Sequence, residues 1–591
     1  MSLIKANAVQ IGQSGIATDN FTLAVPSSPD GTIKLARGNS GATTQDVMNV
    51  SNVGVVSFPQ GLGNISNSTA IATGSTTARS LANRFADMAN VRDFGAVGVG
   101  NDIAAFVDAA DTGKQVLVPD GTYTITVSNQ TQATSIMSMM ERLHLFCTLL
   151  TINFNAGVYT FANRTTFNVT NGEKLKINGA SPTVLSFTSV LSISSTGAGN
   201  HDVTYTVADA SSVNTNDFIL IRPATSAGII AGDFTGALGG VWKVTSKSGN
   251  NITVKNTSPK ASLTGATISC PTGGVIFVKM NTVFNYTTVN SIGLYVKTKL
   301  GTDSGNTSSI GNVVISGGWT PGASVSSNAG VYLEYGASIS CVAEFGVHGF
   351  SGNGIYSLYG GILNAANVCA SANGTNGFYA LNGSIFQLVR AQATGNGSTG
   401  IVSSSNSTVA ASQSASSGNT TGFFASDGSS IICNYGDARF NESYGFTSRA
   451  NSSIDALGSR SVSNKEGVHA IQTSIIDFTS GTATSNSTAN FIEDEAISKI
   501  YGAVNPTGAR AEKSHNFGTI LANTIATTTI TVPNVSIGDV VAVGWNGADV
   551  TGLMVSARAS ATDTITIYAA NITTGSIIVG NRTYYVAILE R

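Results

Sequence analysis

Apolar residues return at a near-constant interval in the second half of the chain. From Gly352 to Phe491, one apolar residue follows a Gly or Asn at every step of 22 or 23 residues. These apolar positions are Ile355, Phe378, Ile401, Phe423, Phe446, Val468 and Phe491. An asparagine keeps the same interval four or five residues earlier in each repeat, at Asn373, Asn396, Asn419, Asn441, Asn464 and Asn486. A repeat near this length indicates stacked coils, because one unit cannot bury its own apolar face.

Each repeat is rich in β-branched and aromatic residues, Ser, Thr and Gly, and lacks the i, i+3, i+4 apolar spacing of a helix. We therefore predict a mainly β protein built on a right-handed parallel β-helix, in which equivalent residues of adjacent coils lie about 4.8 Å apart. The Asn positions would form an internal amide ladder at a tight bend, where Asn also tolerates left-handed backbone. A Ser or Thr before a branched residue marks the same repeat at Ser384-Ile385, Thr408-Val409, Ser430-Ile431 and Ser453-Ile454.

Changes in this pattern divide the chain into six segments. Residues 1–77 predict an N-terminal β-domain and a linker, 78–125 predict helices at 78–89 and 101–110 that cap the β-helix, and 126–191 predict its first coils. Residues 192–270 break the rhythm and predict an inserted small β-barrel or sandwich. The main β-helix follows over 271–505, and strong alternation over 506–591 predicts an antiparallel β-sandwich.

Two stretches resemble a known family. The sequence NVRDFGAVG, followed by IAAFVDAA and VLVPDGTYTI, resembles the opening of pectate-lyase-like β-helices in bacteriophage tailspikes, and the likeness covers roughly residues 74–125. The Asp-rich segment usual in that family is shortened here to Asp102. TITVPNVSIGDVVAVG near the C-terminus resembles C-terminal modules of phage tail proteins. The resemblance implies an N-terminal unit that attaches to the virion, a shaft that contacts a host polysaccharide, and a C-terminal module for trimerisation or glycan contact.

The composition excludes several classes of function. The chain has 591 residues, only 10% of them charged, with a net charge of −2, so electrostatic binding to nucleic acid or anionic membrane is not expected. The sequence contains no run of 18 apolar residues, so no membrane-spanning helix is expected. The N-terminus MSLIKANAVQIG lacks the apolar region of a signal peptide. Five scattered histidines and five cysteines show no metal-ligand spacing, so no metal or cofactor is expected. The cysteines, predicted to be buried free thiols, are Cys147, Cys270, Cys341, Cys369 and Cys433.

Two charged columns stand out against this low charge. Asp455 and Asp477 lie nine residues beyond the periodic apolar position on adjacent coils, so their carboxyl groups would be on the order of 5 Å apart, as in glycosidases with paired carboxylates. Like charges at that distance raise one pKa, which suits a general acid. Asp437 lies under Arg460 in another column, where a surface salt bridge is the simpler interpretation.

Other candidates lie near these columns. Glu442, Glu466 and His469 gather near a neighbouring bend, although solvated coils also need some charge without any chemistry. Five tyrosines on successive coils would stack sugar rings if they point outward and fill the core if they point inward: Tyr332, Tyr335, Tyr356, Tyr359 and Tyr379. The candidate catalytic residues are Asp455, Asp477, Asp437 and Glu442. The candidate substrate-binding residues are Arg460, His469, Glu466, Tyr356 and Tyr359.

Taken together, the sequence predicts a homotrimeric tailspike, made in the host cytoplasm and carried on the virion tail. It would recognise a host surface polysaccharide of O-antigen or capsule type and dock on tail, baseplate or portal-adaptor proteins. Three hypotheses remain open. The spike degrades the glycan, with a hydrolase favoured over a lyase; it binds the glycan without catalysis; or the chain is a secreted or cell-wall adhesin.

Overall fold

The computed structural model describes most of the chain beyond residue 86 and parts of what precedes it. The described residues are 8–11, 21–24, 33–39, 42–50, 56–57, 69–70, 79–80, 87–195, 201–223, 239–257, 275–288, 290–300, 310–320, 323–326, 328–341, 344–494, 498–501, 510–532, 535–546 and 550–590. By contact the chain divides into two units, Met1–Ala89 and Asn90–Arg591.

The first unit contains a five-stranded antiparallel sheet in which sequence neighbours pair. Its strands are β1 (Ala8–Ile11), β2 (Phe21–Ala24), β3 (Ile33–Asn39), β4 (Ala42–Val50) and β5 (Val56–Ser57). Two short strands pair next, β6 (Thr69–Ala70) with β7 (Arg79–Ser80). The helix predicted over 78–89 is not seen at its ends, because Arg79 lies in β7 and Met88 begins a strand. Residues 81–86 lie outside the described part of the chain.

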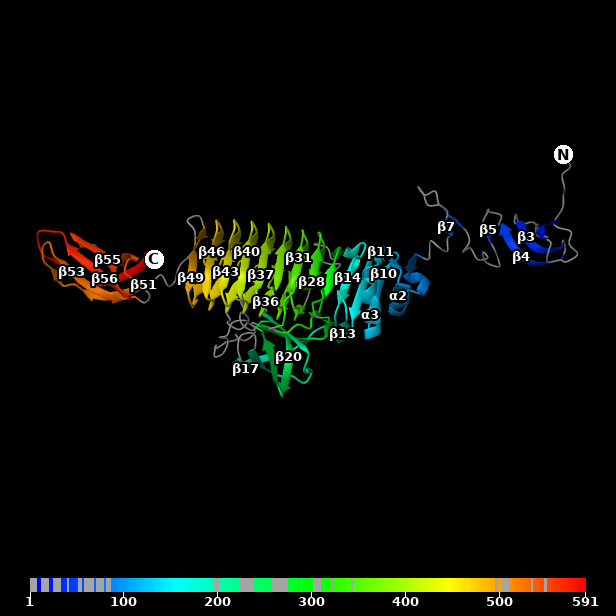
Figure 1. Ribbon diagram of the computed structural model, residues 1–591, viewed down its shortest axis with the longest axis horizontal. Coiled ribbons are helices and arrows are strands. Elements are labelled where there is room, and N and C mark those ends of the chain that lie inside the picture. The colour runs from blue at the N-terminus through cyan, green and yellow to red at the C-terminus, as the bar shows by residue number, and fades with distance from the viewer. Residues whose placement is uncertain are drawn as a thin grey trace, which may run out of the picture. The chain divides into compact units, whose positions relative to one another are not determined.

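A cap of short elements opens the second unit. It consists of the 3-10 helix η3 (Val91–Phe94), α2 (Ile103–Asp111), β9 (Gln115–Val118), α3 (Gln130–Met139) and β11 (Leu143–Leu145). The strand β8 (Met88–Asn90) leads into it, and the 3-10 helix η4 (Gly172–Lys174) lies within the first coils. The helix predicted over 101–110 is confirmed as α2, whose Phe106 ring lies 5.9 Å from the ring of Tyr123 in the first coil. This helix covers an open strand edge that would otherwise pair with other chains (Figure 1). The sequence did not predict α3, which interrupts the first coils.

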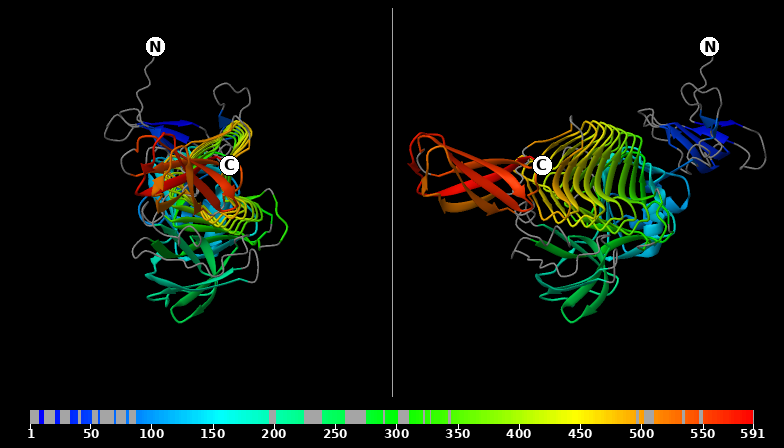
Figure 2. Two further views of the ribbon diagram at one scale, coloured as in Figure 1. Left: turned by 90° about the vertical axis from the view of Figure 1, so that its left-hand side faces the viewer. Right: turned by 60° about the vertical axis from the view of Figure 1, so that its left-hand side comes forward.

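The main body is a parallel β-solenoid of three long sheets, as predicted (Figures 1 and 2). The β10–β50 sheet contains β10 (Thr122–Val127), β12 (Leu149–Phe154), β15 (Leu175–Asn178), β25 (Lys299–Leu300), β26 (Ile310–Gly311), β29 (Ser338–Cys341), β32 (Ile362–Ala366), β35 (Ile385–Val389), β38 (Thr408–Ala410), β41 (Ser430–Ile432), β44 (Ser453–Asp455), β47 (Ile475–Asp477) and β50 (Lys499–Tyr501). The β13–β48 sheet contains β13 (Gly157–Phe161), β23 (Thr282–Tyr286), β27 (Val313–Ser316), β30 (Phe345–His348), β33 (Val368–Ser371), β36 (Gln392–Thr394), β39 (Ala415–Ser417), β42 (Asp437–Arg439), β45 (Arg460–Val462) and β48 (Thr482–Thr484). The β14–β49 sheet contains β14 (Thr165–Phe167), β24 (Leu294–Val296), β28 (Ala329–Glu334), β31 (Asn353–Leu358), β34 (Phe378–Leu381), β37 (Thr399–Ser404), β40 (Thr421–Ser426), β43 (Tyr444–Ser448), β46 (Glu466–Ala470) and β49 (Ala489–Glu493).

The apolar column predicted from the repeat is confirmed along its whole length. Each of its members pairs in register with the next, from Ile355 in β31 to Phe491 in β49. All but the last are fully buried, and the rings of Phe423 and Phe446 stack with centroids 4.9 Å apart and planes 4° apart. The core therefore consists of stacked identical positions, which is what a period of one coil requires.

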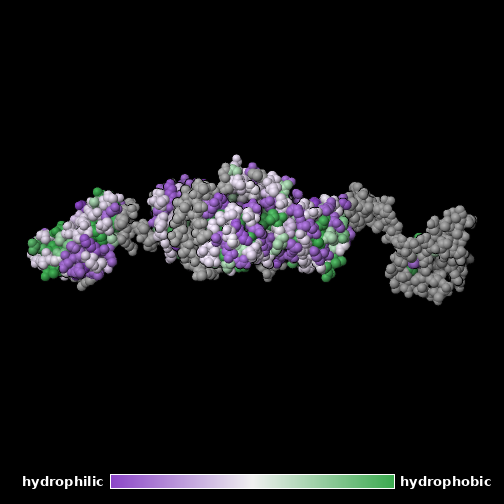
Figure 3. Space-filling model, turned by 90° about the horizontal axis from the view of Figure 1, so that it is seen from below, coloured by the Kyte–Doolittle hydropathy of each residue, from purple (hydrophilic) through white to green (hydrophobic). Residues whose placement is uncertain are grey.

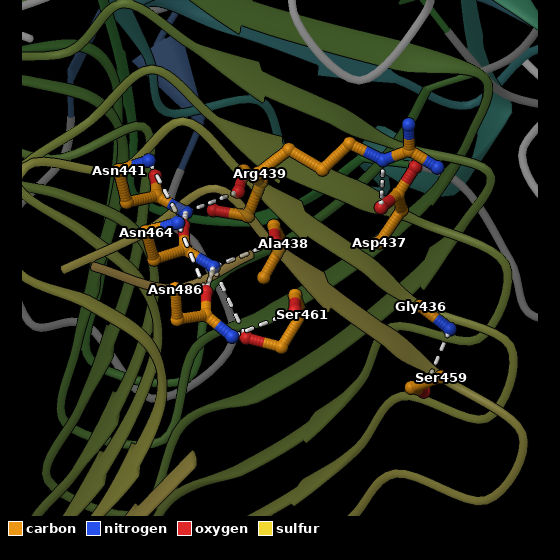
Figure 4. Close-up of polar contacts among 10 residues, drawn as sticks. Gly436, Asp437, Ala438, Arg439, Asn441, Ser459, Ser461, Asn464 and Asn486 are labelled. Atoms are coloured by element: carbon orange, nitrogen blue, oxygen red, sulfur yellow. Dashed lines mark hydrogen bonds and ion pairs between the residues drawn. The ribbon is translucent and has the colours of Figure 1, made fainter. Parts of the chain in front are cut away.

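The predicted amide ladder is also present, at the bend between the β13–β48 and β14–β49 sheets. Each Asn side-chain oxygen accepts hydrogen bonds from the backbone and side-chain N–H groups of the Asn one coil before, for example 2.9 and 2.9 Å from Asn441 to Asn464 (Figure 4). The left-handed residue of each bend is the one before the Asn, such as Phe440 (φ 52°) or Ser463 (φ 58°). The Asn itself was wrongly expected to take that conformation, and its role is to satisfy buried backbone donors instead.

A serine ladder at the next bend shows where the repeat was misaligned. Ser384 lies one coil from Ser407, whose hydroxyl accepts its backbone N–H at 3.2 Å, and Ile385 pairs with Thr408. The predicted Ser384-Ile385 pair was therefore one residue out of register with Thr408-Val409. The ladder continues through Ser429 and is fully buried, so serine here replaces the amide as the acceptor for bend N–H groups.

The insert is a seven-stranded antiparallel sheet that starts before residue 192 and ends after residue 270. Its strands, in spatial order, are β16 (Thr183–Val184), β22 (Val275–Met280), β19 (Phe218–Pro223), β20 (Gly240–Ser248), β21 (Asn251–Asn256), β18 (His201–Val207) and β17 (Phe187–Ser195). It is fixed to the solenoid by Arg222, whose guanidinium makes a two-pronged ion pair with Glu344 at 2.8 and 2.5 Å. The backbone N–H of Val241 also donates to Ser371 Oγ at 3.1 Å. The insert thus covers part of the β13–β48 sheet.

The C-terminal part is an antiparallel sandwich, as predicted. One sheet contains β51 (Arg510–Asn516), β58 (Asn581–Glu590) and β54 (Val540–Trp545), and another contains β53 (Ile525–Thr531), β56 (Thr564–Asn571) and β55 (Leu553–Ala561), with β52 (Thr519–Ile520) paired to β57 (Ile577–Ile578). Buried Ile530, Ile565 and Tyr584 belong to the core shared by the two larger sheets. Figure 3 shows a surface that is mostly pale or purple, with green in small patches, as expected from so many hydroxyl and amide side chains.

We expect Asn419→Ala to destabilise the solenoid strongly. Its side-chain oxygen accepts from Asn396 N and Nδ2 at 2.9 and 3.1 Å, and its Nδ2 donates to Ala393 O at 2.9 Å. Three buried polar groups lose a partner, which costs about 2–5 kcal/mol of unfolding free energy, measured by urea titration. Ser453→Ala on an exposed position is the control and should change the unfolding free energy little. Equal unfolding curves for both variants would show that the ladder is dispensable.

Candidate functional site: the tyrosine face

Four tyrosines form a row on the outer side of the β14–β49 sheet. Tyr295, Tyr332, Tyr356 and Tyr379 pair in register on successive coils, each next to a buried residue of the apolar column. Side chains alternate between the two faces of a strand, so the tyrosines point outward. Their ring centroids follow one another at 5.3, 5.2 and 5.2 Å. The outward alternative is thus the one observed, and Tyr295 extends the row by one coil that the sequence interpretation missed.

Two further tyrosines lie at the end of the same strands. Tyr335 and Tyr359 directly follow β28 and β31, are 71% and 50% exposed, and stack with centroids 5.3 Å apart and planes 10° apart. Both adopt left-handed backbone, with φ of 46° and 57°, whereas Asn382 takes this position on the next coil. A bulky residue held there costs of order 1–3 kcal/mol. Exposed rings kept at such a position indicate a role outside the fold. We call these six tyrosines the tyrosine face.

Polar groups frame one end of the tyrosine face. The Tyr295 phenol donates a hydrogen bond to the Glu334 carboxylate, and the Arg164 guanidinium lies 4.6 Å from the centre of the Tyr295 ring. Thr166 pairs with Tyr295 and lines, together with Arg164 and Glu141 beyond α3, a hollow of about 530 Å³. Aromatic rings beside hydrogen-bonding groups suit a ligand with alternating apolar and hydroxyl surfaces.

The phenols of Tyr332, Tyr356 and Tyr379 stay protonated at neutral pH. Burial raises the pKa of Tyr356, and the neighbouring phenols of Tyr332 and Tyr379 raise it further. Burial likewise raises the pKa of Tyr332 and Tyr379. The row therefore presents neutral hydroxyl groups and ring faces rather than negative charge.

Asp455 and Asp477 lie on a different face, the outer side of the β10–β50 sheet. The two residues pair in register between β44 and β47, as predicted, and both are half-buried. Each carboxylate also serves its own turn. Asp455 accepts the N–H of Leu457 at 3.4 Å, and Asp477 accepts the N–H and hydroxyl of Thr479 at 3.0 and 2.6 Å. The register therefore places the two residues on adjacent strands, and each carboxylate caps its own turn.

Asp437 lies in register with Arg460, as predicted, but it is not on the surface. Its side chain is 0% exposed and forms an ion pair of 2.6 Å with Arg439, which is also 0% exposed (Figure 4). Phe440, which follows this strand, packs against the core of the insert. A carboxylate enclosed in this way does not contact a ligand in solution, so we no longer assign it to catalysis.

The cluster around His469 is real, and Asp494 belongs to it. The column of the tyrosine row continues after Tyr379 through Val402, and His469 lies three coils beyond Val402 in the same column. Its side chain is mostly buried. Its Nδ1 lies 3.2 Å from Glu466 and its Nε2 lies 2.6 Å from Asp494. Asp494 was missed because it falls after the last complete repeat. Glu442 is exposed at the bend before β43, outside these ion pairs.

Over the ranges that the structure describes, the remaining histidines and cysteines form no metal-binding arrangement. No group of three or more His, Cys, Asp or Glu side chains suited to a metal occurs among the described residues. Cys147, Cys341, Cys369 and Cys433 are buried free thiols, and Cys270 lies outside the described residues. Within the described part of the chain, no helix is long and apolar enough to cross a membrane.

Neither a protein-family model nor a curated protein matches this chain. Several solved structures are similar to it. The tailspike gp49 of Pseudomonas phage LKA1 is 15% identical, over 85% of this chain and 100% of that one, with a TM-score of 0.28. The gp54 tailspike of Acinetobacter baumannii bacteriophage AP22, in complex with capsular saccharide, is 11% identical over 90% and 100%, with a TM-score of 0.27. A mutant tailspike of E. coli bacteriophage HK620, in complex with a hexasaccharide, is 10% identical over 90% and 98%, with a TM-score of 0.30. At these values the function has to be argued from this chain's own residues.

Proposed function

We propose that this chain is a bacteriophage tailspike that binds a host surface polysaccharide through the tyrosine face. The observation that carries the proposal is the row of outward tyrosines at 5.2–5.3 Å spacing beside the stacked, exposed pair Tyr335 and Tyr359. Pyranose rings expose CH groups on one side and hydroxyls around the edge. The CH side packs on aromatic faces, and the hydroxyls form hydrogen bonds with phenols and carboxylates. The resemblance of residues 74–125 to tailspike β-helices supports the same function. The N-terminal unit would then dock on tail, baseplate or portal-adaptor proteins of the virion.

The double variant Tyr335→Ala, Tyr359→Ala tests this binding. We expect at least ten-fold weaker binding to the host polysaccharide, because stacking area is lost at two adjacent sites. Thermal stability should change little, because both side chains are largely exposed and alanine keeps the same left-handed backbone. Surface polysaccharides purified from candidate hosts are titrated calorimetrically to measure the affinity. Tyr435→Ala is the matched control, an exposed tyrosine (45%) with φ 58° outside the tyrosine face. Unchanged affinity in the double variant would remove the tyrosine face from recognition.

We also infer a second, catalytic function, in which the spike hydrolyses the glycan through Asp455 and Asp477, one acting as general acid and then as base and the other as nucleophile. It is favoured by their register, since adjacent parallel strands hold equivalent residues about 4.8 Å apart, close to the separation of carboxyl groups in retaining glycosidases. Neither residue is fully buried within one chain. Binding without catalysis is the alternative.

Asp455→Asn and Asp477→Asn separate these two functions. If the pair is catalytic, each variant lowers the release of new reducing ends from host polysaccharide by about 10²-fold or more while the affinity remains. Asp209→Asn is the control, because Asp209 caps its turn in the same way, at 2.7 Å from Ser211 N. Full release by both variants would exclude this pair. Absence of release by the wild-type chain would leave a binding protein, and an unsaturated product would indicate a lyase.

Self-association is proposed through the outer side of the β10–β50 sheet. Large apolar side chains are exposed there along several coils, namely Ile385 (41%), Val389 (42%), Ile432 (39%), Ile475 (43%) and Tyr501 (52%). Such a face is normally covered, and a homotrimer covers it on all three chains.

Analytical ultracentrifugation should therefore give three times the 60.3 kDa mass of one chain. Ile432→Lys places a charge on this face and should shift the distribution toward monomer, whereas Ser398→Lys, at an exposed bend before β37 and outside this sheet, should not. A monomeric wild-type protein would contradict the proposal.

A further inference from the structure

A second polar hollow lies between the insert and the solenoid, apart from the tyrosine face. It measures about 480 Å³, and its lining includes Lys243, Lys255, Trp319, Asn285 and His348. We call it the insert cleft. Its floor is the outward column Asn285–Ser316–His348 from three successive coils, and one wall is the strand pair β20–β21.

The charge of the insert cleft is one-sided. Two lysines and one histidine are among its described lining residues, and no Asp or Glu is. The whole chain carries 32 acidic and 30 basic residues, so this lining departs from the average. Burial and the charge of Lys243 lower the pKa of His348 to about 3, so the imidazole is neutral at neutral pH and the lysines supply the positive charge.

The two lysines are held side by side at a cost. Each lies one residue from the paired Val244 and Val254, on the face opposite those buried valines. Like charges facing each other across a sheet are destabilising. Lys255 is partly neutralised by Asp202 at 2.6 Å, whereas Lys243 is exposed and makes no ion pair with a described residue. Lys243 is therefore the cation that a ligand would neutralise.

The insert cleft also offers the contacts that a sugar ring needs. Trp319 is half-buried at its edge, and its indole Nε1 donates to Ala323 O at 3.2 Å, which fixes the ring. Asn285 and Ser316 offer an amide and a hydroxyl from the floor. An aromatic ring, neutral hydrogen-bonding groups and an unneutralised lysine together match a sugar that carries a carboxylate.

We propose that the insert cleft binds a carboxylate-bearing sugar of the polysaccharide, with Lys243 as the residue that recognises the carboxylate and Trp319 as the stacking platform. This inference rests on the proposed function, glycan binding, and adds the class of glycan: an acidic one, such as a polymer of uronic or nonulosonic acids. The tyrosine face would hold neutral stretches of the same chain.

The test titrates the full-length protein calorimetrically with hexamers of galacturonate, mannuronate and sialate, and with the carboxyl-reduced form of each. We expect at least one acidic hexamer to bind and its reduced form to bind ten-fold or more weakly, since a hydrogen bond to a charged group contributes more than a neutral one. Lys243→Gln should weaken binding of the acidic hexamer to a similar extent. Lys243→Arg should retain most of the affinity for that hexamer. Lys465→Gln, an exposed lysine at a distant bend of the solenoid, should leave it unchanged.

Three results would overturn the inference: no acidic hexamer binds, the reduced form binds equally well, or Lys243→Gln binds as the wild type does. The variant Tyr335→Ala, Tyr359→Ala distinguishes this failure from failure of the proposed function. If the double variant no longer binds the host polysaccharide and no acidic hexamer binds the wild type, the proposal for the tyrosine face is supported and the proposal for the insert cleft is rejected. If the double variant still binds the host polysaccharide and Lys243→Gln no longer binds the acidic hexamer, only the proposal for the insert cleft is supported.

Discussion

The register between adjacent coils is the constraint on which the whole solenoid depends. Every residue lies about 4.8 Å above its equivalent in the previous coil, and a slip of one residue would move each core side chain to the outer face. The buried Asn ladder holds this register, because each amide oxygen takes two N–H groups of the adjacent coil. Once the register of the buried side chains is fixed, the register of the outward side chains is fixed too, because both belong to the same strands. Each outward residue is therefore aligned with its equivalent on the next coil. Columns such as the tyrosine row, most of which precedes the Asn ladder, follow from the parallel strand pairing that also aligns the core.

This is why so much of the architecture can be predicted by counting. The apolar column, the Asn ladder, and the pairings of Asp455 with Asp477 and of Asp437 with Arg460 all follow from an interval of 22 or 23 residues, and each is confirmed. Counting fails where a local motif is matched at the wrong interval. Ser384 was aligned with Thr408 because both precede a branched residue, although its partner at the regular interval is Ser407. It also fails at the ends, where Asp494 follows the last full repeat.

The repeat does not predict which part of the chain packs against the outer face of a column. Asp437 faces outward, yet it is fully enclosed and pairs with Arg439, because the outer side of the β13–β48 sheet is partly covered by an insert encoded some 200 residues earlier. The insert cleft has the same origin. Lys243 and His348 are about 100 residues apart, belong to different kinds of sheet and meet only because the two sheets pack together. No periodicity connects them, so no reading of the sequence along the repeat brings them into one site.

The three outer faces of the solenoid differ in chemistry, and this difference limits where a glycan can bind. The β14–β49 sheet presents aromatic rings, the β13–β48 sheet is partly covered by the insert, and the β10–β50 sheet presents apolar side chains with Asp455 and Asp477 among them. If the apolar face is the one buried between subunits, Asp455 and Asp477 lie at or beside the subunit interface. Only a glycan that runs along this interface would then reach them. The tyrosine face and the insert cleft belong to the other two sheets, so burial of the apolar face would leave both open. The proposed glycan binding would then be independent of self-association, whereas access of a glycan to Asp455 and Asp477 would be limited by it.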